Sequence, residues 1–191
     1  MFLFKSPSVD IANVKNAEHL WDLSNWPSLG NGNTFDVASL KSKKAIIVVN
    51  TASKCGLTGG HYDKLQELYD KYSDQGLEIL GFPSNDFSQE HAEACERDKR
   101  ASKLKFPRFD LVHVNGEEAH DIYNWLKMRS GVFGYKAGDK TVNEATKAQL
   151  QRIGWNFGKF LVTNQGKDVK YFGPRTGPMA MEDDIKKALG V

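Results

Sequence analysis

The spacing of apolar residues predicts a buried strand followed by a helix in the first third of the chain. Residues 45–49 are uninterruptedly apolar, which is typical of a strand buried on both faces. Apolar residues at helical spacing then predict a helix over 59–73; they are Tyr62, Leu65, Leu68, Tyr69 and Tyr72. Thr58 is the predicted N-cap of that helix. Cys55 is therefore expected in the turn between the strand and the helix.

The same reasoning divides the rest of the chain into alternating elements. The stretch 18–42 predicts two short strands joined by the turn-rich loop 27–33, an N-terminal β-hairpin. Further strands are predicted at 77–82, 109–114, 159–163 and 169–172, and further helices at 90–103, 119–128, 143–151 and 182–189. This order predicts an α/β fold with a central mixed sheet and helices on both faces. Residues 1–18 are interpreted as an N-terminal extension and 19–191 as one domain.

Composition narrows the class of protein. The 191 residues are 40% hydrophobic and 26% charged, which is ordinary for a globular domain, and the net charge is +2. No apolar stretch approaches the length of a membrane-spanning helix, and no nucleic-acid-binding or phosphate-binding motif is present. Two cysteines do not form a secreted disulfide scaffold in so long a chain, so we expect a reducing, cytoplasmic location.

The position of Cys55 predicts a reactive thiol. Unpaired backbone N–H groups and the positive end of the helix dipole follow it, and Lys54 precedes it. Both features favour the thiolate, which is the nucleophilic form. A disulfide between Cys55 and a second cysteine one helical turn later is disfavoured, because the residue at that position is Thr58. The sulfur is expected to be regenerated by a distant cysteine or by an external thiol.

Three segments carry a specific resemblance. Residues 49–58 (VNTASKCGLT), 79–90 (ILGFPSNDFSQE) and 155–162 (WNFGKFLV) resemble, in that order, the three signatures of the glutathione peroxidase family. The resemblance covers about residue 18 to the end. It implies a thioredoxin-like fold and the reduction of hydrogen peroxide and of organic or lipid hydroperoxides.

The resemblance also implies a catalytic set. Cys55 would attack the peroxide, and Gln89, Trp155 and Asn156 would surround it with neutral hydrogen-bond donors, which stabilise a thiolate. Cys55 would become a sulfenic acid and then be reduced by glutathione or by a thioredoxin-type protein. No metal or organic cofactor is expected. The family comparison favours a monomer, although the loop before Trp155 is longer than in small monomeric members.

Two departures from the family pattern affect this interpretation. The second signature has Asp86 before Phe87 and is one residue shorter than usual, which affects the placement of Gln89. Cys95 lies 40 residues after Cys55, earlier than the resolving cysteine of thioredoxin-dependent members. Cys95 is either a resolving cysteine that needs its helix to unwind, or a bystander on a solvated helix.

Other functions remain as alternatives. A thioredoxin-fold redox sensor or relay would pass oxidation to a partner protein, and a catalytically silent homologue would lack the intact set of four residues. A peroxiredoxin is disfavoured because Ala52, and not threonine, stands three residues before Cys55. His91 and Cys95 share a helix face, but a single pair of ligands is weak evidence for a zinc site.

Overall fold

A computed structural model describes residues 11–133 and 152–191 of the chain. Its strands are β1 (Ala45–Thr51), β2 (Leu77–Pro83), β3 (Lys159–Thr163) and β4 (Asp168–Phe172). Its α-helices are α1 (Ile11–Asn16), α2 (Thr58–Tyr72), α3 (Ala94–Ala101), α4 (Asp121–Ser130) and α6 (Glu182–Leu189). Short 3-10 helices lie at Leu20–Asp22, Val37–Ser42, Ser73–Gln75 and Pro178–Met181.

The four strands form one mixed sheet in the order β2-β1-β3-β4. β1 pairs parallel with β2 and antiparallel with β3, and β4 pairs antiparallel with β3. Every residue of β1 is buried, as the apolar run predicted. The strand that leads to Cys55 is therefore central and fixed on both edges.

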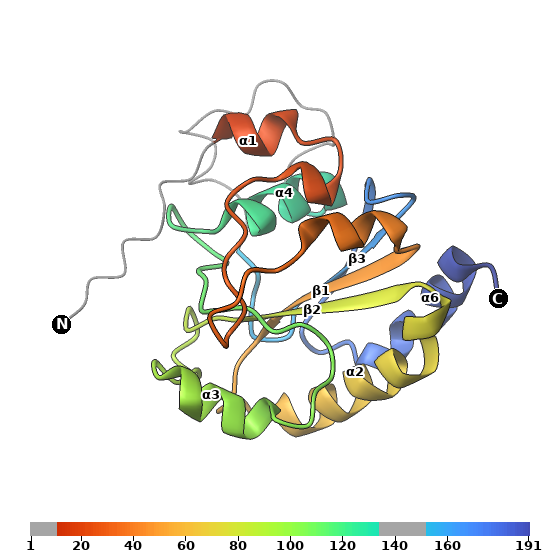
Figure 1. The fold of residues 1–191 in the computed structure, drawn as a ribbon. Coiled ribbons are helices and arrows are strands. Elements are labelled where there is room, and N and C mark those ends of the chain that lie inside the picture. Colours follow the sequence, from red (N-terminus) through yellow and green to blue (C-terminus); the bar gives the residue numbers. More distant parts are fainter. Residues whose placement is uncertain (1–10, 134–151) are drawn as a thin grey trace.

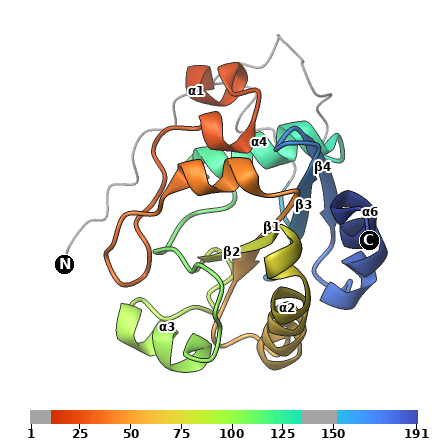
Figure 2. The same cartoon turned by 45° about the vertical axis from the view of Figure 1, so that its right-hand side comes forward.

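Helices cover both faces of this sheet, as the order of elements predicted (Figures 1 and 2). Ile46 and Val48 of β1 face a core that includes α1 and α4, whereas Ala45, Ile47 and Val49 face α2 and α6. The alternation follows from the two-residue period of a strand. Because the cores on both sides are apolar, β1 and β2 are near-continuous hydrophobic runs.

The predicted N-terminal β-hairpin is wrong. Within 18–42 the chain forms two 3-10 helices, and among the described residues its one β contact is an isolated bridge between Leu29 and Phe109. The Asp36 side chain accepts a 3.0 Å hydrogen bond from Ala38 N and so caps the second of these helices. A capping side chain thus offers the backbone an alternative to strand pairing.

The predicted strand at 109–114 is also absent. Residues 107–112 run beside β2 and make only scattered bonds to it, such as Phe109 N to Gly81 O at 2.9 Å. The backbone N–H groups of Val114 and Asn115 are turned instead to the Asp86 carboxylate, both at 2.8 Å. These two N–H groups therefore bond to a buried side chain and not to a neighbouring strand.

The remaining elements agree with the sequence, apart from their ends. The strands at 77–82, 159–163 and 169–172 and the helices at 59–73, 119–128 and 182–189 are confirmed, whereas the predicted helix 90–103 shortens to α3. The helix predicted at 143–151 lies outside the described residues. Part of the interpreted extension is folded: α1 rests on α4, where Asn13 Nδ2 donates to Asp121 Oδ2 at 2.8 Å.

Candidate active site

Cys55 lies in the turn between β1 and α2, as the sequence predicted. Its side chain is only 7% exposed. Among the described residues, the Leu57 N–H is the one donor within hydrogen-bond distance of the sulfur, with N and Sγ 3.5 Å apart. The predicted N-cap is wrong: α2 has no side-chain cap, and Thr58 Oγ1 instead donates to Ala52 O at 2.5 Å. Thr58 thereby closes the turn around Cys55.

The loop that carries Gln89 is tied to this turn by its neighbours. Lys54 N donates to Gln89 O at 2.9 Å. Glu90 accepts from Ser53 N at 3.1 Å and from Ser53 Oγ, and its Oε1 also accepts from His91 N at 2.8 Å. The carboxylate is buried, and these donors satisfy it. Ser53 and Glu90 thus form a clasp that holds the Gln89 loop against the Cys55 turn.

The loop that carries Trp155 and Asn156 is fixed to the end of β1 by Asn50. Asn50 O accepts from Phe157 N at 2.7 Å, and Asn50 N donates to Gly158 O at 3.3 Å. Its side-chain Nδ2 donates to Trp155 O at 3.3 Å. Asn50 therefore places the third signature beside the first. Sequence reasoning missed Asn50 and Glu90, because their partners are far away in the chain.

Gln89 and Asn156 meet directly. Asn156 Nδ2 donates to Gln89 Oε1 at 2.8 Å across 67 positions of the sequence. Asn156 is fully buried, and its Oδ1 has no hydrogen-bond partner among the described residues. An unpaired buried oxygen is costly unless a ligand or a water molecule completes it. Asn156 Oδ1 is therefore available to accept a hydrogen bond from a ligand or a water molecule.

Trp155 and Cys95 are placed differently from this pair. Trp155 is 42% exposed and its ring centroid lies 5.4 Å from that of Phe87, so it forms the open rim of the site. Cys95 is an exposed free cysteine in α3. No hydrogen bond joins either residue to the Cys55 sulfur within the described ranges.

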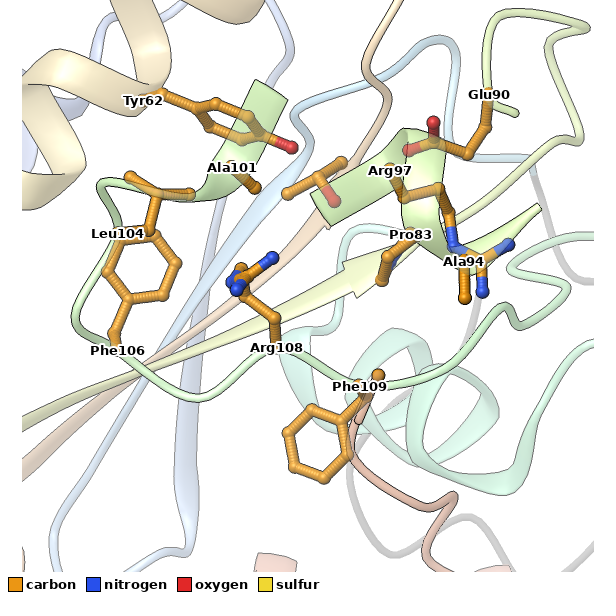
Figure 3. Close-up of a pocket in the computed structure, with 12 residues that line it drawn as sticks. Tyr62, Pro83, Glu90, Ala94, Arg97, Ala101, Leu104, Phe106, Arg108 and Phe109 are labelled. Carbon is orange, nitrogen blue, oxygen red and sulfur yellow. The ribbon is translucent and has the colours of Figure 1, made fainter. Parts of the chain in front are cut away.

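A small cavity lies between α2 and α3, with Thr51 at the end of β1 in its lining. Figure 3 shows Tyr62 at one end and Glu90 with Arg97 at the other, with Arg108 directed into the space between them. Its interior of about 10 Å³ is near the lower limit for one water molecule. This cavity is therefore too small for an organic ligand, and Cys55 is not in its lining.

Two buried basic groups lie behind the site. Lys159 is fully buried, donating to Phe157 O at 2.5 Å and to Gly173 O at 3.0 Å, and burial lowers its pKa to about 8. His61 Nδ1 lies 3.1 Å from Leu57 O, and its ring packs on Phe157 at 4.8 Å. Burial, and after it the Lys159 ammonium, lowers the pKa of His61. The sequence indicated no catalytic role for either residue, because it does not show their tertiary environment.

The lowered pKa of His61 predicts acid sensitivity. Its ordinary value is 6.5, so below that pH the unfolded chain binds more protons than the folded one. The free energy of unfolding should therefore fall as the pH drops from 6.5 to 5, by at most about 1.4 kcal/mol per pH unit for one group. His61→Gln should reduce this loss in denaturant titrations at both pH values. Some loss should remain, because burial also lowers the pKa of His120.

His91→Gln is the matched control, since it removes a histidine from a different part of the chain. An acid-induced loss of the same size in His61→Gln and in the unmodified chain would contradict the assignment to His61.

Metal and membrane features are limited in the part of the chain that the structure describes. Residues 11–133 and 152–191 contain no group of three or more His, Cys, Asp or Glu side chains that could hold a metal ion. Within the same ranges, no helix combines the length and apolarity needed to cross a bilayer.

Comparisons with known proteins identify similar sequences and a similar structure. The family model described as glutathione peroxidase matches residues 23–127. A probable phospholipid hydroperoxide glutathione peroxidase of Nicotiana sylvestris is 43% identical over 164 residues, which cover 84% of this chain and 88% of that protein. The crystal structure of Trgpx in apo form has a TM-score of 0.66 and 32% identity, covering 92% of this chain and 98% of that one.

More distant structures share the fold alone. A thioredoxin-family thiol:disulfide interchange protein of Chlorobium tepidum has a TM-score of 0.54 at 17% identity, covering 87% of this chain and 99% of that one. The predicted thioredoxin-like fold, with its mixed sheet flanked by helices, is confirmed.

Proposed function

The chain belongs to the glutathione peroxidase family, and from that premise we propose that Cys55 is the thiol that attacks the peroxide, assisted by Gln89, Trp155 and Asn156. Membership makes the protein a thiol-dependent peroxidase that reduces hydroperoxides. The assignment of roles to individual residues is our proposal.

The contact between Asn156 and Gln89 is the observation that supports this proposal most directly. It joins the second and third signatures at 2.8 Å, and the clasp of Ser53 and Glu90 holds Gln89 beside the Cys55 turn. The Asn156 amide is engaged with Gln89 Oε1, so the Gln89 Nε2 and Trp155 Nε1 donors are left for the reacting atoms. Neutral donors stabilise the thiolate and the developing oxyanion without neutralising the nucleophile.

The first half of the reaction breaks the O–O bond. The Cys55 thiolate attacks one peroxide oxygen, and the bonding electron pair leaves with the other oxygen. That oxygen takes a proton and departs as an alcohol, or as water when the substrate is hydrogen peroxide. Cys55 is oxidised to sulfenic acid and the peroxide is reduced.

The second half restores the thiolate. A thiol attacks the sulfenic sulfur, an S–S bond forms, and water leaves. A second thiol then exchanges with this mixed disulfide and releases Cys55. The co-substrate is a thiol, and we propose that glutathione or a thioredoxin-type protein supplies it. No metal or prosthetic group takes part in these steps.

Cys95 enters this scheme as a resolving cysteine. It is exposed on α3, where a protein reductant can reach it, whereas Cys55 is buried. If α3 unwinds, the Cys95 thiol condenses with the sulfenic acid and presents an accessible disulfide. We expect Cys95→Ser to lower turnover with thioredoxin at least about tenfold while leaving turnover with glutathione nearly unchanged.

The two reductants are compared in the same preparation, each at saturating peroxide. Ser102→Ala, which removes an exposed hydroxyl at the end of α3, is the matched control. Unchanged turnover of Cys95→Ser with thioredoxin would show that Cys95 is a bystander.

Consumption of hydrogen peroxide and of a lipid hydroperoxide, each with glutathione and with thioredoxin, tests the proposed function. Rapid turnover with at least one pair is expected. A redox relay would be oxidised once and would turn over poorly with every pair; the comparisons do not favour that alternative.

We also propose that the protein is a monomer and that it lies in the cytoplasm. The reducing cytoplasm is in keeping with two free cysteines. Light scattering of the purified protein tests the oligomeric state.

A further inference from the structure

A buried lysine on α4 has no role in the reaction described above. Lys127 is 1% exposed, and its Nζ donates to Asn115 Oδ1 at 3.0 Å. Burial lowers its pKa to about 8, against the opposing effect of the Asp86 carboxylate. Because burying an amine costs free energy, the burial of Lys127 against Asn115 needs an explanation.

The side chain of Asn115 is paired with a single residue of the Trp155 loop. Its Oδ1 accepts from Ile153 N at 2.8 Å, and its Nδ2 donates to Ile153 O at 3.0 Å. The amide thus satisfies both backbone groups of Ile153, as a neighbouring strand would. Ile153 is 1% exposed and precedes Trp155 by two residues. The Asn115 amide therefore fixes the start of the loop that carries Trp155 and Asn156.

The backbone of Asn115 is attached to the other loop. Its N–H and that of Val114 both donate to Asp86 Oδ2 at 2.8 Å, and His113 Nδ1 lies 2.7 Å from Asp86 Oδ1. The Asp86 side chain is only 5% exposed. Asp86 precedes Phe87, whose ring packs on Trp155, and lies three residues before Gln89. One residue, Asn115, therefore contacts both loops that meet at the site.

We propose that Asn115, held in place by Lys127, is a positioning residue that sets the two loops in register so that Gln89 and Asn156 meet. This inference rests on the proposed function. It goes further, because it assigns the relative placement of the two loops to a residue outside the three signatures. Asn115 does not touch the reacting atoms. It acts through the contact between Gln89 Oε1 and Asn156 Nδ2.

A double-mutant cycle on the full chain tests this coupling. The measured quantity is the second-order rate constant of Cys55 with hydrogen peroxide, per titrated thiol of folded protein. Asn115→Ala should lower it about tenfold in the unmodified chain but less than about twofold in the Asn156→Ala background. The reductive half-reaction with a small thiol should be unchanged. A purely structural defect would give equal losses in both backgrounds.

Asn124→Ala is the matched control. Asn124 is a buried asparagine of α4 whose Nδ2 donates to Ala119 O at 2.8 Å, and within the described ranges no hydrogen bond joins it to either loop of the site. Asn124→Ala should lose stability but keep the peroxide rate constant. If Asn115→Ala does not fold, Lys127→Met takes its place, since it keeps the volume of the side chain and should show the same non-additivity with a smaller loss.

Equal losses in both backgrounds, an unchanged rate constant in a folded Asn115→Ala protein, or an equal loss in Asn124→Ala would overturn the positioning role. None of these results affects the proposed function. A normal rate constant in Asn156→Ala alone would instead remove the catalytic assignment of Asn156, and the positioning role with it.

Discussion

Replacing Cys55 with serine should abolish hydroperoxide reduction. The alcohol of serine is far less acidic than a thiol and cannot form a sulfenic acid, so both halves of the cycle lose their reacting atom. We expect a fall in kcat/KM of at least about 1,000-fold, the scale on which removing a nucleophile acts. Steady-state turnover with hydrogen peroxide and a thiol measures it.

The chain provides its own control for this substitution. Cys95→Ser removes the other thiol, which is exposed, and should keep the peroxide-consuming half-reaction. Because Ser differs from Cys by one atom, the Cys55→Ser protein should fold normally and keep the circular dichroism of the parent. Residual turnover within tenfold of the parent would mean that another group attacks the peroxide.

Asn156→Ala should have the second largest effect. It removes the 2.8 Å hydrogen bond to Gln89 and leaves the Gln89 amide without the contact that orients it. Gln89 Nε2 is one of the proposed donors to the reacting atoms, and losing one preorganised donor typically lowers the rate about 100-fold or more. The second-order rate constant with peroxide in a stopped-flow experiment is the appropriate measurement, since it isolates the oxidative half.

Asn156→Asp refines this experiment. The carboxylate keeps the volume of the side chain but places a negative charge in a fully buried site, where an unpaired charge is costly, so we expect a loss at least as large as that of the alanine variant. Asn124→Ala again serves as the control for a lost buried amide. A rate constant within twofold of the parent in both Asn156 variants would separate this residue from catalysis.

The parts of the fold that are dictated by local patterns were predictable from the sequence. The apolar run of β1 and the helical spacing of α2 placed Cys55 between them. The elements that failed depend on distant partners. The strand expected at 109–114 gives its last N–H group, that of Val114, to Asp86, as does Asn115 just beyond it, and Thr58 bonds Ala52 O and does not cap α2. No local pattern reveals that such acceptors are nearby.

The candidate site divides in the same way. Cys55 was indicated by its position, and Gln89, Trp155 and Asn156 by resemblance to the signatures. Asn50, Glu90 and Asn115 were missed, because each acts by holding a segment that is remote in sequence. Their polar side chains are indistinguishable in the sequence from ordinary turn residues.

The clasp of Ser53 and Glu90 has a consequence for motion. Together with the bond from Lys54 N to Gln89 O, it fastens the turn bearing the sulfur to the loop bearing the amide at several points. We therefore expect the thermal displacements of the two segments to be correlated. We expect the separation between the turn and the loop to fluctuate less than the position of either segment.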